Sequence, residues 1–295
     1  MTTRKGNGHF AVIGMFDGVH TGHRYLLGEL KKLAASKGLS PLAITFSNHP
    51  LELIAPEKTP QLLTTTTEKL RLINEENVNG IAIPFDHKLR CTSAMDFLHL
   101  LHDRYGVEAL LMGYNNRFGH NAPKGFDEYR NMGEQCNIDI IPAKEYTPKE
   151  GTRVSSTEIR RLLKEGNVED AARLLGRPYA LSGTVESGKQ LGRRLGFPTA
   201  NLRLSDPRQL VPMGGVYATT ALDRPAMTNI GTRPTVDNTG ETTIETHIIG
   251  CDKDLYGSPL TVSFRHRIRP ERRFNSPEDL AAQLQSDRMA ALARF

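Results

Sequence analysis

Residues 10–27 read Phe-Ala-Val-Ile-Gly-Met-Phe-Asp-Gly-Val-His-Thr-Gly-His-Arg-Tyr-Leu-Leu. The apolar run at residues 10–13 predicts a buried strand, and Gly14 and Gly18 allow a sharp turn after it. From His20 onward, apolar residues recur at three- and four-residue spacing, which indicates a helix. This stretch therefore predicts a strand, a tight turn and a helix in immediate succession.

Two histidines, His20 and His23, lie where the predicted turn enters the helix. Free backbone N–H groups and the helix dipole make a helix start attractive to phosphate. Residues three apart lie on one side of a helix, so both imidazoles can donate hydrogen bonds to one phosphate in a transition state. The spacing is also compatible with a solvated helix face or with half of a metal site, and these alternatives stay open.

The composition describes a globular chain of 295 residues, with 38% hydrophobic and 24% charged residues. One or two domains are expected at this length. The net charge of +5 fits an anionic small ligand such as ATP, and it leaves weak nucleic-acid contact open. However, Trp is absent and aromatic residues make up 6%, so the basic, aromatic face of a nucleic-acid-binding protein is not indicated.

Three cysteines, Cys91, Cys136 and Cys251, are far apart in the sequence. They form no CxxC pair, so they indicate neither a disulfide framework nor a zinc site, and we expect a cytoplasmic protein. The N-terminal apolar run is too short for a signal peptide. No segment approaches the roughly 18–20 apolar residues of a membrane span, so no membrane association is expected.

Strand and helix patterns alternate over the first half of the chain. Further strands are predicted at residues 40–46, 80–85, 107–112 and 138–141. A helix is predicted to begin within residues 62–73, and two more are predicted at residues 93–105 and 168–175. Such alternation predicts right-handed crossovers and a parallel sheet. Thr65 and Glu68 have the spacing of a capping box, so we interpret the threonines at 64–67 as a helix start.

Polar residues follow two of these strands. His49 comes just after residues 40–46, and the loop Gly-Tyr-Asn-Asn-Arg-Phe-Gly at residues 113–119 follows residues 107–112. Open parallel sheets bind ligands at the carboxyl ends of their strands. The loop suits the ribose or phosphate of a nucleotide, but a surface turn explains it equally well. His49 is equally compatible with simple packing before Pro50.

Residues 153–163 read Arg-Val-Ser-Ser-Thr-Glu-Ile-Arg-Arg-Leu-Leu. Ser155 or Ser156 can cap a helix here, with Glu158 as the reciprocal partner. Together with Arg153 and Arg160, the helix start suits the β- and γ-phosphates of a nucleotide. A well-capped helix without a ligand explains the pattern equally well.

Beyond about residues 178–183 the pattern changes to short β-rich runs with glycine and proline turns. This change predicts an antiparallel barrel or sandwich, and we place the domain boundary there, giving domains at residues 1–178 and 183–295. Residues 183–190 nearly match a Walker A motif, but Gln190 replaces the hydroxyl residue that binds Mg²⁺, so we reject a P-loop. Residues 276–295 predict a capped amphipathic helix over the barrel, with an apolar face of Leu280, Leu284 and Met289.

Two runs in the second domain suggest chemistry. Residues 188–201 read Gly-Lys-Gln-Leu-Gly-Arg-Arg-Leu-Gly-Phe-Pro-Thr-Ala-Asn; a basic glycine-rich loop can close over phosphates, and a hydroxyl and an amide held by proline suit Mg²⁺. Residues 241–248, Glu-Thr-Thr-Ile-Glu-Thr-His-Ile, alternate as a strand, so Glu245 and His247 share one face. A carboxylate there can act as the base that phosphorylation of an alcohol benefits from. From the residues alone, a loop without a ligand and an ordinary surface carboxylate also explain the two runs, and these alternatives stay open.

These motifs together resemble the bacterial bifunctional riboflavin kinase/FMN adenylyltransferase (FAD synthetase) family. Residues 20–23 are similar to the HxGH motif of nucleotidyltransferases and residues 155–160 to their SSTxIR motif; residues 192–201 resemble the GRxLGFPTAN signature of riboflavin kinases, and residues 229–235 the NIGxxPT turn. The resemblance covers nearly the whole chain. It implies an α/β fold: a Rossmann-like nucleotidyltransferase domain with a parallel sheet, then a small antiparallel β-barrel kinase domain with a C-terminal helix.

The resemblance implies that the second domain phosphorylates riboflavin to FMN with ATP, and that the first adenylates FMN to FAD and releases pyrophosphate. It implies Mg²⁺ as the cofactor, and riboflavin, FMN, FAD and ATP as the partners. A different HxGH adenylyltransferase, acting on nicotinamide mononucleotide or phosphopantetheine, would explain the first domain but would leave residues 192–201 unexplained.

The same resemblance implies roles for individual residues. Catalytic roles fall on His20, His23 and Glu245. In the first domain ATP would contact Gly14, Phe16, Gly22, Ser155, Ser156, Thr157 and Arg160, and the flavin would contact His49 and Asn115. In the kinase domain ATP and Mg²⁺ would contact Gly188, Gly192, Arg193, Gly196, Thr199 and Asn201, with Thr199 as a metal ligand. Asn115 stands where the family commonly has Asp. The asparagine keeps an acceptor oxygen but lacks the negative charge of the carboxylate.

Overall fold

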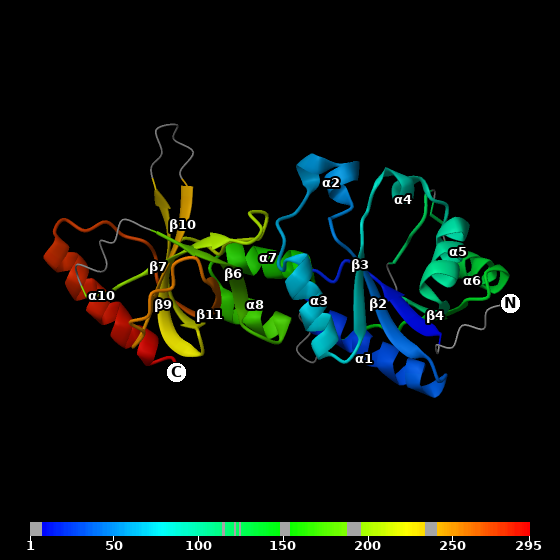
Figure 1. Cartoon of the computed structure of the whole chain (residues 1–295), viewed down its shortest axis with the longest axis horizontal. Coiled ribbons are helices and arrows are strands. Elements are labelled where there is room, and N and C mark those ends of the chain that lie inside the picture. Colours follow the sequence, from blue (N-terminus) through cyan, green and yellow to red (C-terminus); the bar gives the residue numbers. More distant parts are fainter. Residues whose placement is uncertain are drawn as a thin grey trace. The chain divides into compact units, whose positions relative to one another are not determined.

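The computed structural model describes residues 8–113, 116–120, 122–123, 125–147, 154–187, 196–233 and 241–295. The chain forms two compact units (Figure 1). The first comprises Met1–Pro60 and Thr64–Val154, and the second comprises Gln61–Leu63 and Ser155–Phe295.

The first unit is built on a five-stranded parallel sheet with the strand order β3-β2-β1-β4-β5. Its strands are β1 His9–Ile13, β2 Ser40–Phe46, β3 Asn79–Ile83, β4 Val107–Met112 and β5 Asp139–Pro142. The chain moves outward from β1 to β3 and then returns to β4 on the other side of β1. The order therefore reverses between β1 and β4, and such a switch point is where open α/β sheets bind ligands.

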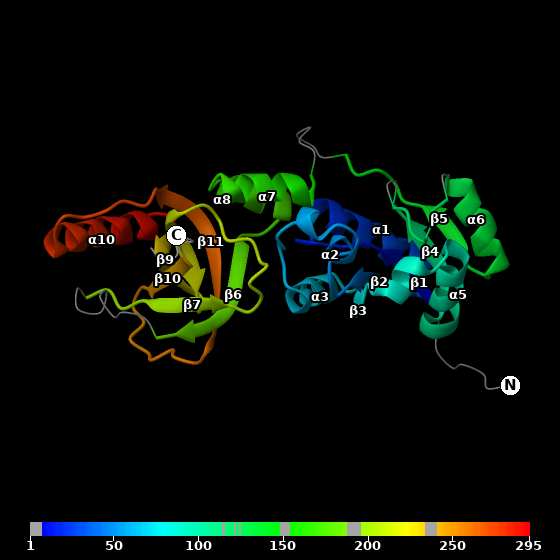
Figure 2. The ribbon, with the colours of Figure 1, turned by 90° about the horizontal axis from the view of Figure 1, so that it is seen from above.

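Helices cover both faces of this sheet (Figure 2). They are α1 Thr21–Ser36, α2 Leu51–Ile54, the short 3₁₀ helix Pro56–Lys58, α3 Thr66–Glu75, α4 His87–Cys91, α5 Ala94–Tyr105 and α6 Phe126–Gln135. In β1, Phe10 and Val12 join the core that includes Leu27 of α1, whereas Ala11 and Ile13 join the core that includes Phe97 of α5. This alternation explains why residues 10–13 of β1 are all apolar.

The predicted parallel sheet is confirmed, and residues 40–46 and 107–112 form the predicted strands without a shift in bounds. The helix expected to open within residues 62–73 begins at Thr66, because Thr65 caps it by accepting a hydrogen bond from the Glu68 N–H at 3.2 Å. The strand expected at 80–85 instead ends at Ile83, just before Pro84, which has no N–H to donate to a sheet.

The second unit is built on a closed barrel with the strand order β10-β7-β6-β11-β8-β9, and its pairs are antiparallel. The strands are β6 Tyr179–Glu186, β7 Ala200–Leu204, β8 Gly215–Ala221, β9 Arg224–Arg233, β10 Glu241–Ile248 and β11 Pro259–Arg269. Of the two predicted architectures, barrel and sandwich, the barrel is confirmed. Closure leaves no exposed sheet edge.

Two helices before the barrel, α7 Ser156–Lys164 and α8 Val168–Leu175, pack on it. Their apolar residues, including Ile159, Leu163 and Leu175, share one core with Leu181 and Phe264 of the barrel strands. The predicted boundary at residues 178–183 therefore lies inside the second compact unit, which begins at Ser155. The reason is that the apolar faces of α7 and α8 bury against the barrel, which a change in strand pattern does not reveal.

The segment Gln61–Leu63 also packs with the barrel unit. Leu63 is buried in its core, the Leu62 N–H donates to the Arg208 carbonyl at 2.9 Å, and the Leu62 carbonyl accepts from the Leu210 N–H at 2.8 Å. These contacts join residues more than a hundred positions apart, and no local pattern in the sequence predicts them.

The C-terminal helix α10, Pro277–Leu292, is capped by Ser276 and lies along the barrel, as predicted (Figures 1 and 2). Leu284 and Ala291 pack against a core that contains Met227. The assignment of Met289 to the apolar face is wrong, because its side chain is 64% exposed. The buried face instead carries Asp287, whose carboxylate pairs with Arg269 at 2.7 Å.

Over the ranges that the structure describes, no helix combines the length and the apolar composition that crossing a lipid bilayer requires.

Candidate active sites

The turn between β1 and α1 has an unusual backbone. Phe16, Gly18 and Val19 have φ angles of 48°, 80° and 38°. Glycine adopts such angles easily, but for a bulky or β-branched residue they are genuine outliers. Both Phe16 and Val19 are 1% exposed, so packing holds them in place. Strain of this kind persists only where the surroundings enforce it, and it concentrates at functional sites.

His20 and His23 are brought together at the start of α1. Their rings stack with centroids 3.6 Å apart and planes at 13°. His20 is the N-cap, and its Nδ1 accepts a hydrogen bond from the His23 N–H at 3.2 Å. Because Nδ1 acts as an acceptor, the proton of the neutral His20 ring lies on Nε2, which can donate. The predicted pair is therefore assembled by the helix cap itself.

The environment of His23 keeps its ring neutral. Burial, then the neighbouring His20 and then Lys69, lower the pKa of His23 well below its usual value. Its Nδ1 atom is buried and has no hydrogen-bond partner among the described residues. A buried ring nitrogen in this position is a candidate contact for a phosphate oxygen of a substrate.

Two glycines leave room around the turn. A Cβ at Gly22 would lie 3.3 Å from the His20 ring and 3.4 Å from Tyr146, and a Cβ at Gly14 would lie 3.2 Å from the Phe16 ring. Each would press on a side chain that defines the turn. The predicted residues Gly14, Phe16 and Gly22 thus lie beside the histidine pair.

Three buried polar residues, which the sequence patterns did not single out, take part in hydrogen bonds that hold this turn in place. Asp17 accepts a hydrogen bond from the Thr64 N–H at 3.1 Å, and the Thr64 hydroxyl accepts from the Gly18 N–H at 3.1 Å. The Lys69 ammonium donates to the Met15 carbonyl. The sequence contained one signal for Lys69: it precedes Leu72 by three residues and Ile73 by four, so it lies on the apolar face of α3.

His49 is placed at the carboxyl end of β2, as predicted, but there it also serves as a local cap. Its Nδ1 accepts from the Leu51 N–H at 3.1 Å, while Glu52 accepts from the His49 N–H at 3.0 Å. Asn115 lies outside the described residues. Its neighbour Asn116 donates to the Ile13 carbonyl at 2.7 Å, which ties the loop after β4 to the end of β1.

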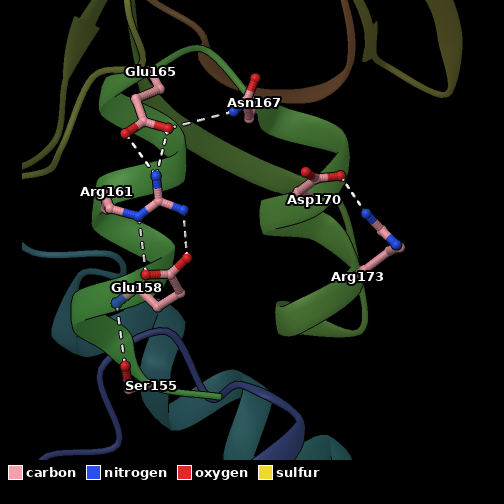
Figure 3. Close-up of polar contacts among 7 residues, drawn as sticks. All are labelled: Ser155, Glu158, Arg161, Glu165, Asn167, Asp170 and Arg173. Atoms are coloured by element: carbon pink, nitrogen blue, oxygen red, sulfur yellow. Dashed lines mark hydrogen bonds and ion pairs between the residues drawn. The ribbon is translucent and has the colours of Figure 1, made fainter. Parts of the chain in front are cut away.

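The start of α7 lies in the second compact unit, and Ser156 and Thr157 are its first residues. Ser155 caps the helix by accepting from the Glu158 N–H at 3.2 Å (Figure 3). The predicted reciprocal contact is wrong: the Glu158 carboxylate instead pairs with Arg161, which also pairs with Glu165. Two charge-assisted bonds to the guanidinium outcompete one bond to an N–H.

Arg160 is engaged at the same helix. Its Nε donates to the Gln61 carbonyl at 2.7 Å, so this side chain helps to hold the Gln61–Leu63 segment in the barrel unit. Arg153 lies outside the described residues.

Two cavities open in the barrel unit, and Thr199 lines both. The larger measures about 250 Å³ and is lined by Glu245, His247, Asn229, Phe197, Phe274 and Leu284, among others. The smaller measures about 70 Å³ and is lined by Asn201, Lys253, Asp254 and Tyr256, among others. The structure thus places the predicted Thr199 at a common wall, with Glu245 on one side and Asn201 on the other.

Regular strand pairing positions the polar groups of the larger cavity. Glu245 of β10 is in register with Asn201 of β7 and with Asn229 of β9, so a carboxylate stands between two amides in one cross-strand row. His247 shares its face, as the alternation predicted. Its Nδ1 donates to the Pro198 carbonyl at 2.8 Å, and burial lowers the pKa of this imidazole despite that bond.

Three further predicted residues, Gly188, Gly192 and Arg193, lie outside the described residues. Gly196 has a φ angle of 81°, a left-handed conformation that suits glycine.

The donor set around the smaller cavity fits magnesium. The Thr199 hydroxyl and the Asn201 amide are hard oxygen ligands, and Asp254 adds a carboxylate. Mg²⁺ is commonly held by one or two protein oxygens together with nucleotide phosphates and water. The described residues contain no cluster of three or more histidine, cysteine or carboxylate side chains that could hold a metal by themselves.

The geometry defines a class of protein: a two-part, phosphate-handling transferase, with a histidine-bearing turn on a Rossmann-like sheet and a carboxylate-lined cavity in a barrel. Comparison with known families agrees with this class. Residues 2–158 match the FAD synthetase family, and residues 175–295 match the riboflavin kinase family.

Curated relatives match along nearly the whole chain. The bifunctional riboflavin kinase/FMN adenylyltransferase of Escherichia coli (strain K12) is 38% identical over 290 residues, which cover 96% of this chain and 91% of the relative. The enzyme of the same name from Pseudomonas fluorescens is 36% identical and covers 97% and 93%. The chain therefore belongs to the bifunctional riboflavin kinase/FMN adenylyltransferase family, and both activities of that family are assigned to it.

A solved structure shares the architecture. The crystal structure titled as a macrolide-efflux protein from Streptococcus pneumoniae matches with a TM-score of 0.82 and 29% identity, and the match covers 96% of this chain and 94% of that one. The two-part fold described above is thus also found in a crystal structure.

Proposed function

We propose that riboflavin binds in the larger barrel cavity and that ATP binds beside the smaller one, with Thr199 between them. The observation that carries this proposal is the shared wall: Thr199 lines both cavities, while Glu245 lines only the larger. Apolar and aromatic side chains such as Phe197 and Leu284 suit a flat flavin ring, and Lys253 suits phosphate.

Glu245 acts as the general base in this proposal. It takes the proton of the ribityl 5′-hydroxyl as that oxygen attacks the γ-phosphorus of ATP, the bond to the β–γ bridging oxygen breaks, and ADP leaves. Asn201 and Asn229, on either side of Glu245 in the strand register, keep the carboxylate among amide groups that can orient it.

Thr199 and Asn201 hold Mg²⁺ and phosphates in this proposal, and Thr199 is the direct metal ligand. When bound, the ion neutralises the negative charge of the phosphates. Gly188, Gly192, Arg193 and Gly196 are proposed to contact the same ATP, with the arginine supplying charge and the glycines allowing close approach of the backbone.

The first unit adenylates FMN in a second reaction. A phosphate oxygen of FMN attacks the α-phosphorus of ATP, the bond to the α–β bridging oxygen breaks, and pyrophosphate leaves. No protein nucleophile is needed, because positioning and electrostatic stabilisation supply the catalysis. We propose that His20 donates from Nε2 to the developing charge and that neutral His23 donates beside it, since their stacked rings share one helix start.

Further residues bind ATP and the flavin in this proposal. Gly14, Phe16 and Gly22 would shape the ATP site at the turn, Ser155, Ser156, Thr157 and Arg160 would bind its phosphates, and His49 and Asn115 would bind the flavin. We retain residues 1–178 and 183–295 as the parts that carry the two activities. We also propose a reducing, cytoplasmic location, because Cys91, Cys136 and Cys251 are all free thiols.

The direct test is a time course with riboflavin, ATP and Mg²⁺ in which the flavins are separated by chromatography. FMN should appear first and FAD afterwards. A protein that makes FAD only from added FMN would contradict the kinase site, and one that stops at FMN would contradict the adenylyltransferase site. Replacing Mg²⁺ with Mn²⁺ in parallel tests the choice of metal.

A further inference from the structure

Lys69 is a buried ammonium group beneath the histidine-bearing turn. Its side chain comes from α3, it is 4% exposed, and its Nζ donates to the Met15 carbonyl at 3.1 Å and to the Phe46 carbonyl at 3.0 Å. Met15 belongs to the turn after β1, and Phe46 is the last residue of β2. The ammonium therefore links the ends of two adjacent parallel strands at the edge where ligands bind.

The contact is costly, which argues against mere filling of space. Burying a charged amine in a protein interior is unfavourable unless it is well compensated. Here burial lowers the pKa of Lys69 to about 8, although the charge of Asp17 opposes the shift. A leucine or methionine would fill the same volume without that cost, so the feature to be explained is the pair of hydrogen bonds to backbone carbonyls.

Those hydrogen bonds hold the turn that leads to the histidine pair. The Met15 carbonyl also accepts from the Thr45 hydroxyl at 3.0 Å, so two donors converge on it. It immediately precedes Phe16, the first residue of the turn with a left-handed backbone. Phe16 in turn packs edge-on against the His23 ring, with centroids 5.2 Å apart. A chain of contacts thus runs from the Lys69 ammonium to the His23 imidazole.

We propose that Lys69 is a positioning residue for FMN adenylylation, which holds Met15 and Phe16 so that the His20–His23 pair keeps its stacked geometry. This inference rests on the proposed role of the histidine pair. A purely structural lysine would instead affect only the stability of the unit. The two roles differ in a measurable way, because a positioning residue loses its effect once the group that it positions has been removed.

The first experiment uses the full chain with Lys69→Met, which keeps an unbranched side chain of similar volume but removes its charge and donors. Adenylation of supplied FMN should lose about 10²-fold in kcat, since small misplacements of a catalytic group have effects of that size, while KM for FMN changes less than about threefold. Riboflavin phosphorylation by the same molecules should be unchanged and reports on the barrel unit, while thermal unfolding should show that the first unit stays folded at the assay temperature. Lys32→Met, at an exposed position on α1, is the matched control and should leave both activities unchanged.

The second experiment is a double-mutant cycle with His23→Ala. Adding Lys69→Met to His23→Ala should lower kcat for adenylation by less than about a further threefold, because Lys69 acts through the geometry of the histidine pair. Independent, multiplicative losses would overturn the proposal, as would a raised KM with kcat unchanged. Lys69→Gln, which retains an amide donor, should recover part of the lost kcat; equal loss in Lys69→Gln and Lys69→Met would contradict the hydrogen-bonding role.

Failures at the two levels are distinguishable. If His23→Ala leaves adenylation intact, the histidine pair is not the reaction centre and the role of Lys69 falls with it. If His23→Ala abolishes adenylation but Lys69→Met does not, the pair is correct and the Lys69 proposal alone is wrong. Thermal unfolding of the first unit below the assay temperature in both Lys69→Met and Lys69→Gln would identify a folding role and would also overturn the proposal.

Discussion

The two candidate sites position their reactive side chains in different ways. In the first unit, the histidines stand on a turn with left-handed residues, and buried Thr64 and Lys69 hold its backbone. In the barrel, Glu245 stands on a regular strand, and cross-strand register alone places it between two amides. The first site therefore depends on tertiary contacts to backbone atoms, whereas the second depends on which residue occupies a strand position.

This difference has a consequence for mutations. A change at the barrel site should remove one chemical function and leave the frame intact, because the β-ladder does not depend on that side chain. A change near the turn should act even at residues that never touch substrate. Substitutions at the two sites should therefore differ in which activity they reduce and by how much.

Glu245→Gln should reduce riboflavin phosphorylation by about 10²–10⁴-fold, the range expected when a general base is removed. The amide has nearly the same shape and should be accepted in the strand. Adenylation of supplied FMN should be unchanged. The measurement is kcat for each reaction on the same preparation, and equal loss of both would indicate misfolding instead of a missing base.

His23→Ala should reduce FMN adenylation by about 10²–10³-fold, as expected when one donor to a developing charge is removed. FMN should then accumulate from riboflavin because the kinase continues to work. Chromatography of the flavins over time checks this result. A parallel fall in FMN production would contradict two separate sites.

Gly22→Ala should reduce adenylation by about tenfold, because its Cβ would lie 3.3 Å from the His20 ring and small displacements of a catalytic group are costly. Gly28→Ala is the matched control on the same helix, since a Cβ there meets no atom of the described residues within 4 Å. That control should stabilise the unit by about 0.5–1 kcal/mol. Equal activity in the two variants would show that the turn tolerates crowding.

The smallest effect concerns pH. Because the folded-state pKa of His23 lies well below its usual value, the unfolded chain takes up a proton near pH 6.5 that the folded chain does not. Stability should therefore fall as the pH decreases below about 6.5. Thermal unfolding of the full chain should show this fall, and His23→Ala should flatten it. His87→Ala, at an exposed position, should leave the slope unchanged.

A second pH dependence has the same sign but lies at higher pH. The pKa of Lys69 is lowered to about 8 in the folded chain, so between about pH 8 and the usual lysine value near 10.5 the unfolded chain binds more protons. Stability from this group should therefore rise with pH in that window, while adenylation should decline as the ammonium loses its charge. Lys69→Met should remove both trends, and riboflavin phosphorylation should not show the decline.

Sequence patterns predicted the secondary structure well where local rules decide it. Strand 107–112 and the caps at Thr65, Ser155 and Ser276 follow from apolar runs and from side chains that bond the next turn. Met289 was misplaced because helical spacing tolerates more than one apolar face, and the barrel selected the one that carries Asp287.

Local patterns of residues were enough to predict the order of the elements and the chemical groups that they carry: the histidine pair at a helix start, the carboxylate on an alternating strand and the Pro-Thr-Ala-Asn turn. These depend on residues within a few positions of one another, where spacing and geometry are directly linked. The resemblance to the family was confirmed by the family matches over residues 2–158 and 175–295.

Contacts between groups that are distant in the sequence depend instead on how the elements pack in three dimensions. That packing placed α7 and α8 on the barrel, set Thr199 between two cavities and aimed the Lys69 ammonium at the carbonyls of Met15 and Phe46. Every residue except proline offers the same backbone N–H and C=O, so no spacing in the sequence identifies the carbonyl that a distant side chain will bind. That choice follows from how the helices pack against the ends of the strands.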